Sequence, residues 1–149
     1  MTLWFLLTSA ALSTAQPGTA LPCPEGSSPP FATDGEAETY LRNFVGAIFG
    51  PDDEKAAEEY FAPGYIAVLN GKRMTLAEEQ AHFASVRASA KDIDYRFGRV
   101  IATCDGLAEQ HSVVLKKLDD SVITLHAMSM IKVANGRITL IEEVAGQSE

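Results

Sequence analysis

The feature that most constrains this chain is a series of four strand-like runs within residues 91–145, joined only by short turns. Each run is rich in Val, Ile and Thr, which favour strands. The turns contain Asp105-Gly106, Asp119-Asp120 and Asn135-Gly136. Asx-Gly pairs supply the positive φ that a tight hairpin needs. The pattern predicts a four-stranded antiparallel meander, with strands at 94–104, 107–118, 121–133 and 137–145.

Apolar residues at helical spacing predict three helices before the meander. The first begins at Thr33 or Asp34, and the third follows Thr75, with Glu78 at the capping-box position. A short strand lies between the second and third helices. The predicted elements are helix 33–49, helix 52–61, strand 65–69 and helix 75–88. This order predicts an α+β fold, with three N-terminal helices packed on a curved antiparallel sheet and a ligand-sized hollow between the layers.

Length and charge limit the function classes. A chain of 149 residues fits one domain. Its formal net charge of −8 predicts no nucleic-acid partner and no anionic membrane partner, because both would be repelled. No run reaches the roughly 18 apolar residues of a membrane span.

The first 33 residues have their own composition. An apolar run at 3–12, followed by small residues, predicts a secretory signal within residues 1–20 and a secreted protein. No Lys or Arg precedes Arg42, so a cytoplasmic protein is the alternative. Residues 21–33 are rich in Pro, Gly and Ser, which predicts a disordered linker before a domain at 34–146. Cys23 and Cys104 are expected to be free thiols, since a linker cysteine has no reason to lie within the ~6 Å between Cα atoms that a disulfide requires.

Several motifs carry a family resemblance over residues 34–145. They are YFAPGY at 60–65, NGKR at 70–73, the helix at 75–87, and Gly136-Arg137-Ile138 followed by Glu142-Glu143. The chain resembles the NTF2-like superfamily, in its SnoaL-like branch. The resemblance implies a conical α+β barrel with a pocket at its wide end, and often a homodimer through the sheet. The superfamily includes isomerases, hydrolases, cyclases and non-catalytic carriers, so the fold alone does not name a reaction.

The resemblance also identifies catalytic positions that this chain has lost. Ketosteroid isomerases carry a tyrosine and a carboxylate base at places that fall here at Phe44 and near Leu69. Relatives of limonene-epoxide hydrolase use an arginine between two acids. Those places fall near His111, at Val113 and at Glu143. The isomerase pair is absent and the hydrolase triad is incomplete.

A constellation of His and Glu residues remains. Strand periodicity places Glu109 and His111 on one face, and Ile141 and Glu143 on one face of the last strand. A regular two-residue turn at Asn135-Gly136 places Met128 opposite Glu143. The predicted catalytic residues are His111 and Glu143, which together can act as a general acid and base. The predicted pocket contains Phe44, Tyr65, Leu69, Phe83, Glu109, His126, Met128 and Ile141. In the alternative interpretation, these His and Glu residues are structural or face solvent.

Two functional hypotheses follow. One is a cofactor-independent isomerase, cyclase or hydrolase acting on a small, mainly apolar molecule. The other is a non-catalytic small-molecule binding or dimerisation module. The sequence shows no spaced metal-ligand motif and no glycine-rich phosphate loop, so neither a metal nor a cofactor is expected. Apolar residues on the second sheet face predict a homodimer; they are Leu125, Ile131, Ile138, Leu140 and Val144.

Overall fold

The computed structural model describes residues 23–50 and 53–147, so the predicted signal at residues 1–20 lies outside the described residues. The helices are α1 (Asp34–Ile48), α2 (Asp53–Tyr60) and α3 (Leu76–Ser89). The strands are β1 (Phe61–Leu69), β2 (Lys72–Thr75), β3 (Ala90–Thr103), β4 (Gly106–Lys117), β5 (Val122–Ala134) and β6 (Arg137–Gln147). None of the described helices is long and apolar enough to span a membrane.

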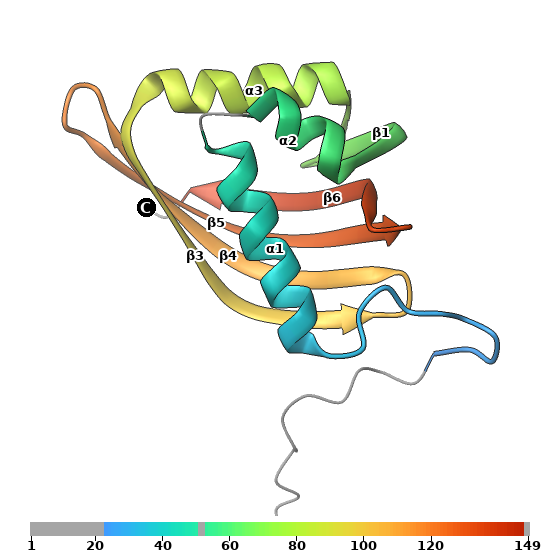
Figure 1. Cartoon of the computed structure of the whole chain (residues 1–149). Coiled ribbons are helices and arrows are strands. Elements are labelled where there is room, and N and C mark those ends of the chain that lie inside the picture. Colours follow the sequence, from blue (N-terminus) through green and yellow to red (C-terminus); the bar gives the residue numbers. More distant parts are fainter. Residues whose placement is uncertain (1–22, 51–52, 148–149) are drawn as a thin grey trace, which may run out of the picture.

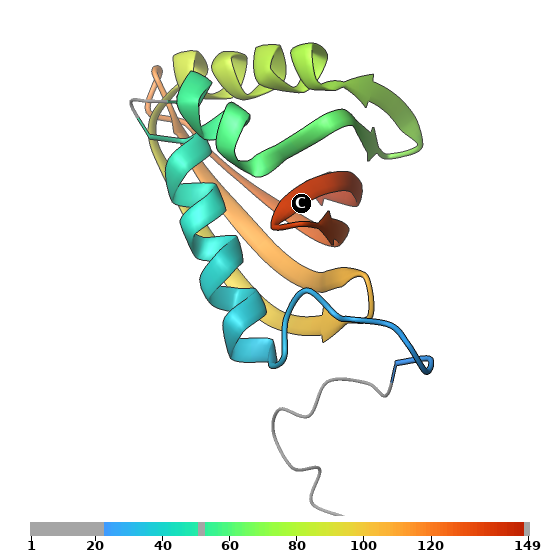
Figure 2. The same cartoon turned by 45° about the vertical axis from the view of Figure 1, so that its right-hand side comes forward.

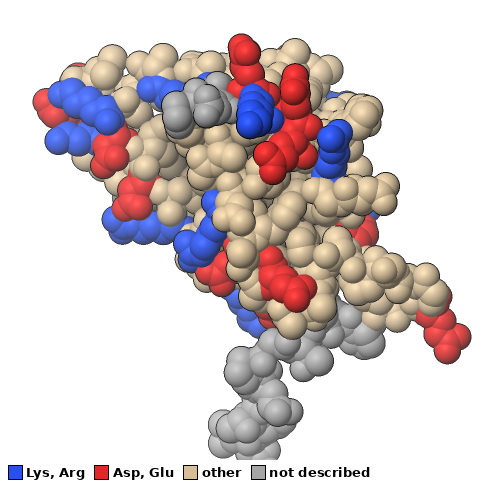
Figure 3. Space-filling view, viewed as in Figure 1, with Lys and Arg blue, Asp and Glu red and all other residues tan. Residues whose placement is uncertain are grey.

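The three helices cover one face of a curved sheet that does not close into a barrel (Figures 1 and 2). The strand order is β2-β1-β6-β5-β4-β3. The predicted meander of β3 to β6 is confirmed. The parallel pairing of β1 with β6 and the short strand β2 were not predicted. Figure 3 shows acidic and basic side chains intermixed over the helical side, so the negative net charge is not gathered on that face.

The α1 helix has the predicted cap and apolar stripe. The Thr33 hydroxyl accepts a hydrogen bond from the Glu36 amide at 3.2 Å. Acidic side chains in the first turn complement the helix dipole. The stripe that packs on the sheet consists of Ala37, Leu41, Phe44, Val45 and Ile48, all buried. Local capping and helical periodicity therefore place this helix across the concave face of the sheet.

The predicted capping box of α3 is also present. The Thr75 hydroxyl accepts from the Glu78 amide, and the Glu78 carboxylate accepts from the Thr75 amide at 2.8 Å. We expect Thr75→Ala to lower the free energy of unfolding by about 1 kcal/mol, because it leaves an orphan amide at the helix start. Chemical denaturation measures this difference. Ser85→Ala, an exposed change within the same helix, is the control, and equal losses in both variants would contradict the role of the cap.

The turns of the meander are built in two different ways. Asn135 and Gly136 have φ of 51° and 76°, as an Asx-Gly hairpin requires. Asp105 and Gly106 do not have positive φ, so the reason given for that turn was wrong. Gly106 is needed there for another purpose: a Cβ atom on it would lie 1.8 Å from the Ile131 carbonyl oxygen. The absence of a side chain allows β4 and β5 to approach closely.

A β-bulge in the last hairpin changes which residues face inward. Ala134 pairs with Arg137 and Val133 with Ile138, but Lys132 pairs with Leu140, so Thr139 is an extra residue on β6. From that point the register is shifted by one residue relative to a regular hairpin. Ser129, not Met128, therefore lies opposite Glu143. The predicted pairing of Met128 with Glu143 was wrong for this reason.

The segment before α1 is attached to the domain. Cys23 and Cys104 form a disulfide with a Cα–Cα distance of 5.4 Å, so the prediction of two free thiols was wrong. Phe31 is buried in the core and packs against Tyr40, with ring centroids 5.1 Å apart and ring planes tilted by 51°. The Cys23 end of the segment is thus fixed to the end of β3, and the Phe31 end to α1. Composition alone did not indicate either contact.

The outer face of the sheet exposes a patch formed by Met128, Met130 and Val144, which we call the outer patch. These side chains are 67%, 55% and 70% exposed, and Met128 pairs with Val144 across β5 and β6. Of the apolar residues predicted for this face, Val144 lies in the outer patch. Ile131 and Ile138 are buried inside, and Leu125 lines the inner cavity. The Thr139 bulge accounts for the inward position of Ile138.

Candidate functional site

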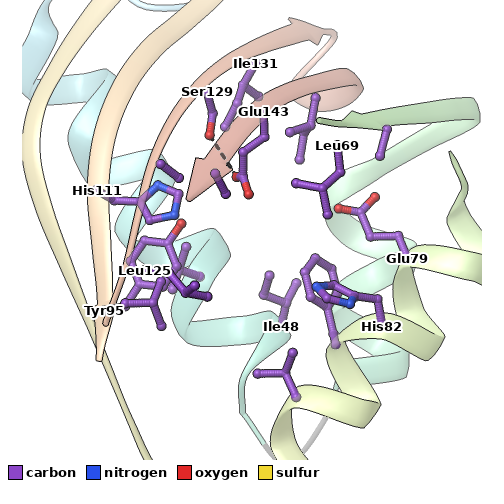
Figure 4. A pocket seen from close by; sticks show the side chains of 18 of the residues that line it. Ile48, Leu69, Glu79, His82, Tyr95, His111, Leu125, Ser129, Ile131 and Glu143 are labelled. Carbon is purple, nitrogen blue, oxygen red and sulfur yellow. Dashed lines mark hydrogen bonds between the residues drawn. The ribbon is translucent and has the colours of Figure 1, made fainter. Parts of the chain in front are cut away.

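A cavity of about 160 Å³ lies between the concave face of the sheet and helices α1 and α3. Apolar side chains from both layers form most of its wall (Figure 4). They include Leu41, Phe44, Ile48, Phe83, Val113, Leu115 and Ile141. An engineered apolar cavity of about 150 Å³ holds one benzene molecule, so this one is large enough for a small organic ligand.

Glu109 and His111 form a buried pair on the sheet wall of the cavity. Both project inward from β4, and each residue is 5% exposed. The His111 Nδ1 and Glu109 Oε1 atoms are 2.7 Å apart. The ring of Tyr95 stacks on the imidazole, with centroids 4.3 Å apart and planes at 28°. The hydrogen bond and the stacking together fix the orientation of His111.

Glu143 lies beside this pair on β6. The bulge at Thr139 turns it inward, where its carboxylate accepts a hydrogen bond from the Ser129 hydroxyl at 2.9 Å. Figure 4 shows His111, Ser129 and Glu143 close together on one wall of the cavity. Ser129 is buried, whereas Glu143 is only partly buried. Glu143 is therefore the carboxylate of this group that is more open to the cavity.

Glu79 belongs to the site, although it was not predicted. It projects from α3 on the opposite side of the cavity and is 6% exposed (Figure 4). The buried Tyr65 hydroxyl donates a hydrogen bond to it. The pKa of Glu79 is raised to about 7: burial raises it most, the hydrogen bond from Tyr65 partly opposes the increase, and the negative charge of Glu143 adds to it. The sequence did contain a signal, because Leu76, Glu79 and Phe83 share one helical face.

The predicted site residues divide into three groups. Phe44, Leu69, Phe83, Glu109, His111, Ile141 and Glu143 line the cavity. Tyr65 is buried, and its contact with the site is through Glu79. His126 and Met128 lie on the outer face, so their assignment to the pocket was wrong. The inward residues of β5 are instead Leu125, Ala127, Ser129 and Ile131, because the bulge shifts the register by one residue.

Glu109, His111 and Glu143 could together hold a metal ion, since one ligand atom of each lies within 4.8 Å of the others. The sequence predicted one pocket for these three residues but no metal, because they show no spaced ligand motif: they come from β4 and β6, which lie on either side of β5. No Lys or Arg lines the cavity among the described residues. The wall therefore offers three carboxylates and two imidazoles, those of His82 and His111. Such a set can bind a cation or transfer protons.

Comparison with known proteins identifies the fold. No family model and no curated protein sequence matches the chain. AclR of Streptomyces galilaeus, a proposed hydroxylase, is similar with a TM-score of 0.66 and 12% identity, over 75% of this chain and 90% of that one. A proposed SnoaL-like polyketide cyclase from Jannaschia sp. CCS1 is similar with a TM-score of 0.61 and 13% identity, over 72% of this chain and 83% of that one.

A third structure is an NTF2-like protein of unknown function from Exiguobacterium sp. 255-15. It gives a TM-score of 0.59 and 20% identity, over 75% of this chain and 99% of that one. At these identities the similarity establishes the fold and not the activity. The chain has the NTF2-like fold found in SnoaL-like proteins, which confirms the resemblance expected from its sequence motifs.

Proposed function

We propose that this protein binds a small, mainly apolar molecule in the cavity and transforms it by general acid–base chemistry, as an isomerase, cyclase or hydrolase. The observation that carries the proposal is the buried Glu109–His111 pair, beside Glu143, in an otherwise mostly apolar wall. An apolar pocket with a few converging polar groups is the usual form of a small-molecule site. The names of the solved relatives AclR and the SnoaL-like cyclase are compatible with a catalytic role.

The Glu109–His111 pair supplies the base in this proposal. The hydrogen bond at Nδ1 leaves Nε2 as the ring nitrogen that is not bound to Glu109. Glu109 stabilises the imidazolium that forms when His111 accepts a proton. Glu79, across the cavity, can return a proton to the ligand. Glu79 suits this role because a group with a pKa of about 7 is protonated in a large fraction of molecules at neutral pH.

The second candidate is a non-catalytic carrier or sensor of the same kind of molecule. It is favoured by Phe44 and Leu69, which line the cavity where the resemblance to ketosteroid isomerases would place a tyrosine and a carboxylate. Both candidates need the cavity, but only the catalytic one needs proton transfer at His111.

We expect His111→Ala to reduce turnover about 100-fold or more, since general acid–base groups contribute about 10²–10⁴ in rate. The protein is incubated with a small-molecule extract of the cells that make it, and untargeted mass spectrometry records which compounds bind and which change. Glu142→Gln, an exposed change on β6, is the control. Compounds that the wild type and the control convert, but His111→Ala does not, support the enzyme. Compounds that are bound but not converted support the carrier, and no bound compound contradicts both.

We also propose that the protein is a homodimer through the outer face of the sheet. The outer patch is a contiguous exposed apolar surface, and such surfaces often mark interfaces. We expect a dimer mass by light scattering at micromolar concentration, and a monomer mass for Val144→Glu, which places a charge in the patch. Leu118→Glu is the control, because Leu118 is 60% exposed but lies in the turn between β4 and β5. A monomeric wild type would contradict the proposal.

Secretion is the proposed localisation. The disulfide between Cys23 and Cys104 supports it, because disulfides form and persist mainly in oxidising compartments. The apolar run at residues 3–12 supports it from the sequence. Neither nucleic acid nor a membrane is proposed as a partner.

A further inference from the structure

The charges around the cavity do not balance. Glu79, Glu109 and Glu143 line it, and no Lys or Arg does so among the described residues. Glu109 has the imidazole of His111 as its hydrogen-bonding partner. Glu79 can remain neutral by keeping a proton near pH 7. The Glu143 carboxylate accepts a hydrogen bond from the hydroxyl of Ser129, a neutral donor. Among the described residues, no Lys or Arg in the cavity wall balances the carboxylate of Glu143.

A second observation points to the same missing group. The Glu109 side chain is 1% exposed, and its Oε2 atom has no hydrogen-bond partner among the residues that the structure describes. Leaving a buried acceptor unsatisfied costs about 1–3 kcal/mol, and more for a charged one. One ligand atom each from Glu109, His111 and Glu143 lies within 4.8 Å of the others, so a donor or a cation bound among them can serve more than one carboxylate.

A row of aromatic rings lies next to the acids. Phe83 and Phe49 have ring centroids 5.6 Å apart, Phe49 and Tyr95 6.3 Å apart, and Tyr95 stacks on His111. All four residues line the cavity. Aromatic faces attract organic cations and also pack against hydrocarbon. Carboxylates together with aromatic rings are the chemistry that proteins use to recognise ammonium groups.

We propose that the natural ligand carries a protonated amine on a small apolar frame, with the ammonium group beside Glu143 and the frame against the aromatic row. This inference rests on the proposed small-molecule function and adds the charge class of the ligand. A divalent metal ion would balance the charge of the acidic side chains but would explain no other feature of the cavity. It would not account for an apolar cavity of about 160 Å³ with an aromatic wall, which an organic frame fills.

The test compares three molecules of nearly the same shape: cyclohexylamine, cyclohexanol and cyclohexanecarboxylate. Their dissociation constants for the full chain are measured at pH 7 by ligand-observed NMR, in the presence of EDTA. We expect the amine to bind about tenfold tighter than the alcohol or better, and the carboxylate to bind weakest. Glu143→Gln should remove most of the preference for the amine over the alcohol. Glu142→Gln should behave as the wild type.

The outcomes separate the inference from the function on which it rests. Equal binding of amine and alcohol, or tightest binding of the carboxylate, overturns the inference and leaves the small-molecule pocket intact. No binding of any of the three contradicts both. The three dissociation constants of the wild-type protein test the inference even if Glu143→Gln fails to fold. Zn²⁺ and Mn²⁺ are also titrated without EDTA, first alone and then before the three-ligand series is repeated. Micromolar metal binding that abolishes the amine preference would identify a metal as the native cation.

Discussion

Replacing Cys23 and Cys104 together by serine is expected to lower the free energy of unfolding by about 4 kcal/mol. The two residues are 81 positions apart, and closing so long a loop restricts the unfolded chain strongly. Since small domains are stable by only about 5–15 kcal/mol, this loss is a large part of the total. Urea denaturation of the oxidised wild type and of the double variant measures the difference.

Reduction provides the control for this experiment. A reducing agent should destabilise the wild type by a similar amount and should leave the double serine variant unchanged. If the wild type unfolds at the same urea concentration with and without the reducing agent, the bridge does not contribute to stability. The attachment of the segment before α1 would then depend on other contacts, such as those of Phe31.

The second large effect concerns Glu79 and pH. Its pKa is raised from 4.5 to about 7 in the folded protein, mainly by burial. Between these values the folded state binds more protons than the unfolded state. The contribution of Glu79 to stability is therefore complete below pH 4.5 and is lost as the pH rises to about 7. The shift corresponds to about 3 kcal/mol.

Glu79→Gln removes this titration, so the unfolding free energy of the variant should fall less between pH 4.5 and 7 than that of the wild type. Urea denaturation at half-unit pH steps measures the two curves, and their difference isolates Glu79 from the other groups. Glu58→Gln, an exposed acid on α2, is the control and should follow the wild type. Parallel curves for Glu79→Gln and the wild type would show that Glu79 is not held in a raised-pKa environment.

Local signals were enough to predict most of the fold. Capping residues such as Thr33 and Thr75, and the Asn135-Gly136 turn, act within a few residues, so the sequence displays them directly. The parallel pairing of β1 with β6 joins segments about 75 residues apart and has no local signal. The disulfide is also a contact between distant segments without a local signal, because nothing near Cys23 indicates that this residue approaches the end of β3.

The candidate site was predicted only in part for a related reason. Period-two alternation was sufficient to place Glu109 and His111 on one face of β4. The inward position of Glu143 was expected, but its neighbour depends on the bulge at Thr139, which a regular turn does not suggest. Met128 and His126 were assigned inward for that reason, and Ser129 was missed. Glu79 was missed because an acid on a helix is usually solvent-exposed.

The most direct test of the account is whether a small ligand binds on the inner face of the sheet and not on the outer face. Methyl groups are labelled with ¹³C, and the protein is titrated with cyclohexanol while NMR follows each methyl signal. We predict shifts at Val113, Leu125 and Ile141, which line the cavity, and none at Met128, Met130 or Val144 in the outer patch. Shifts confined to the outer patch, or no shifts at saturating ligand, would contradict the account.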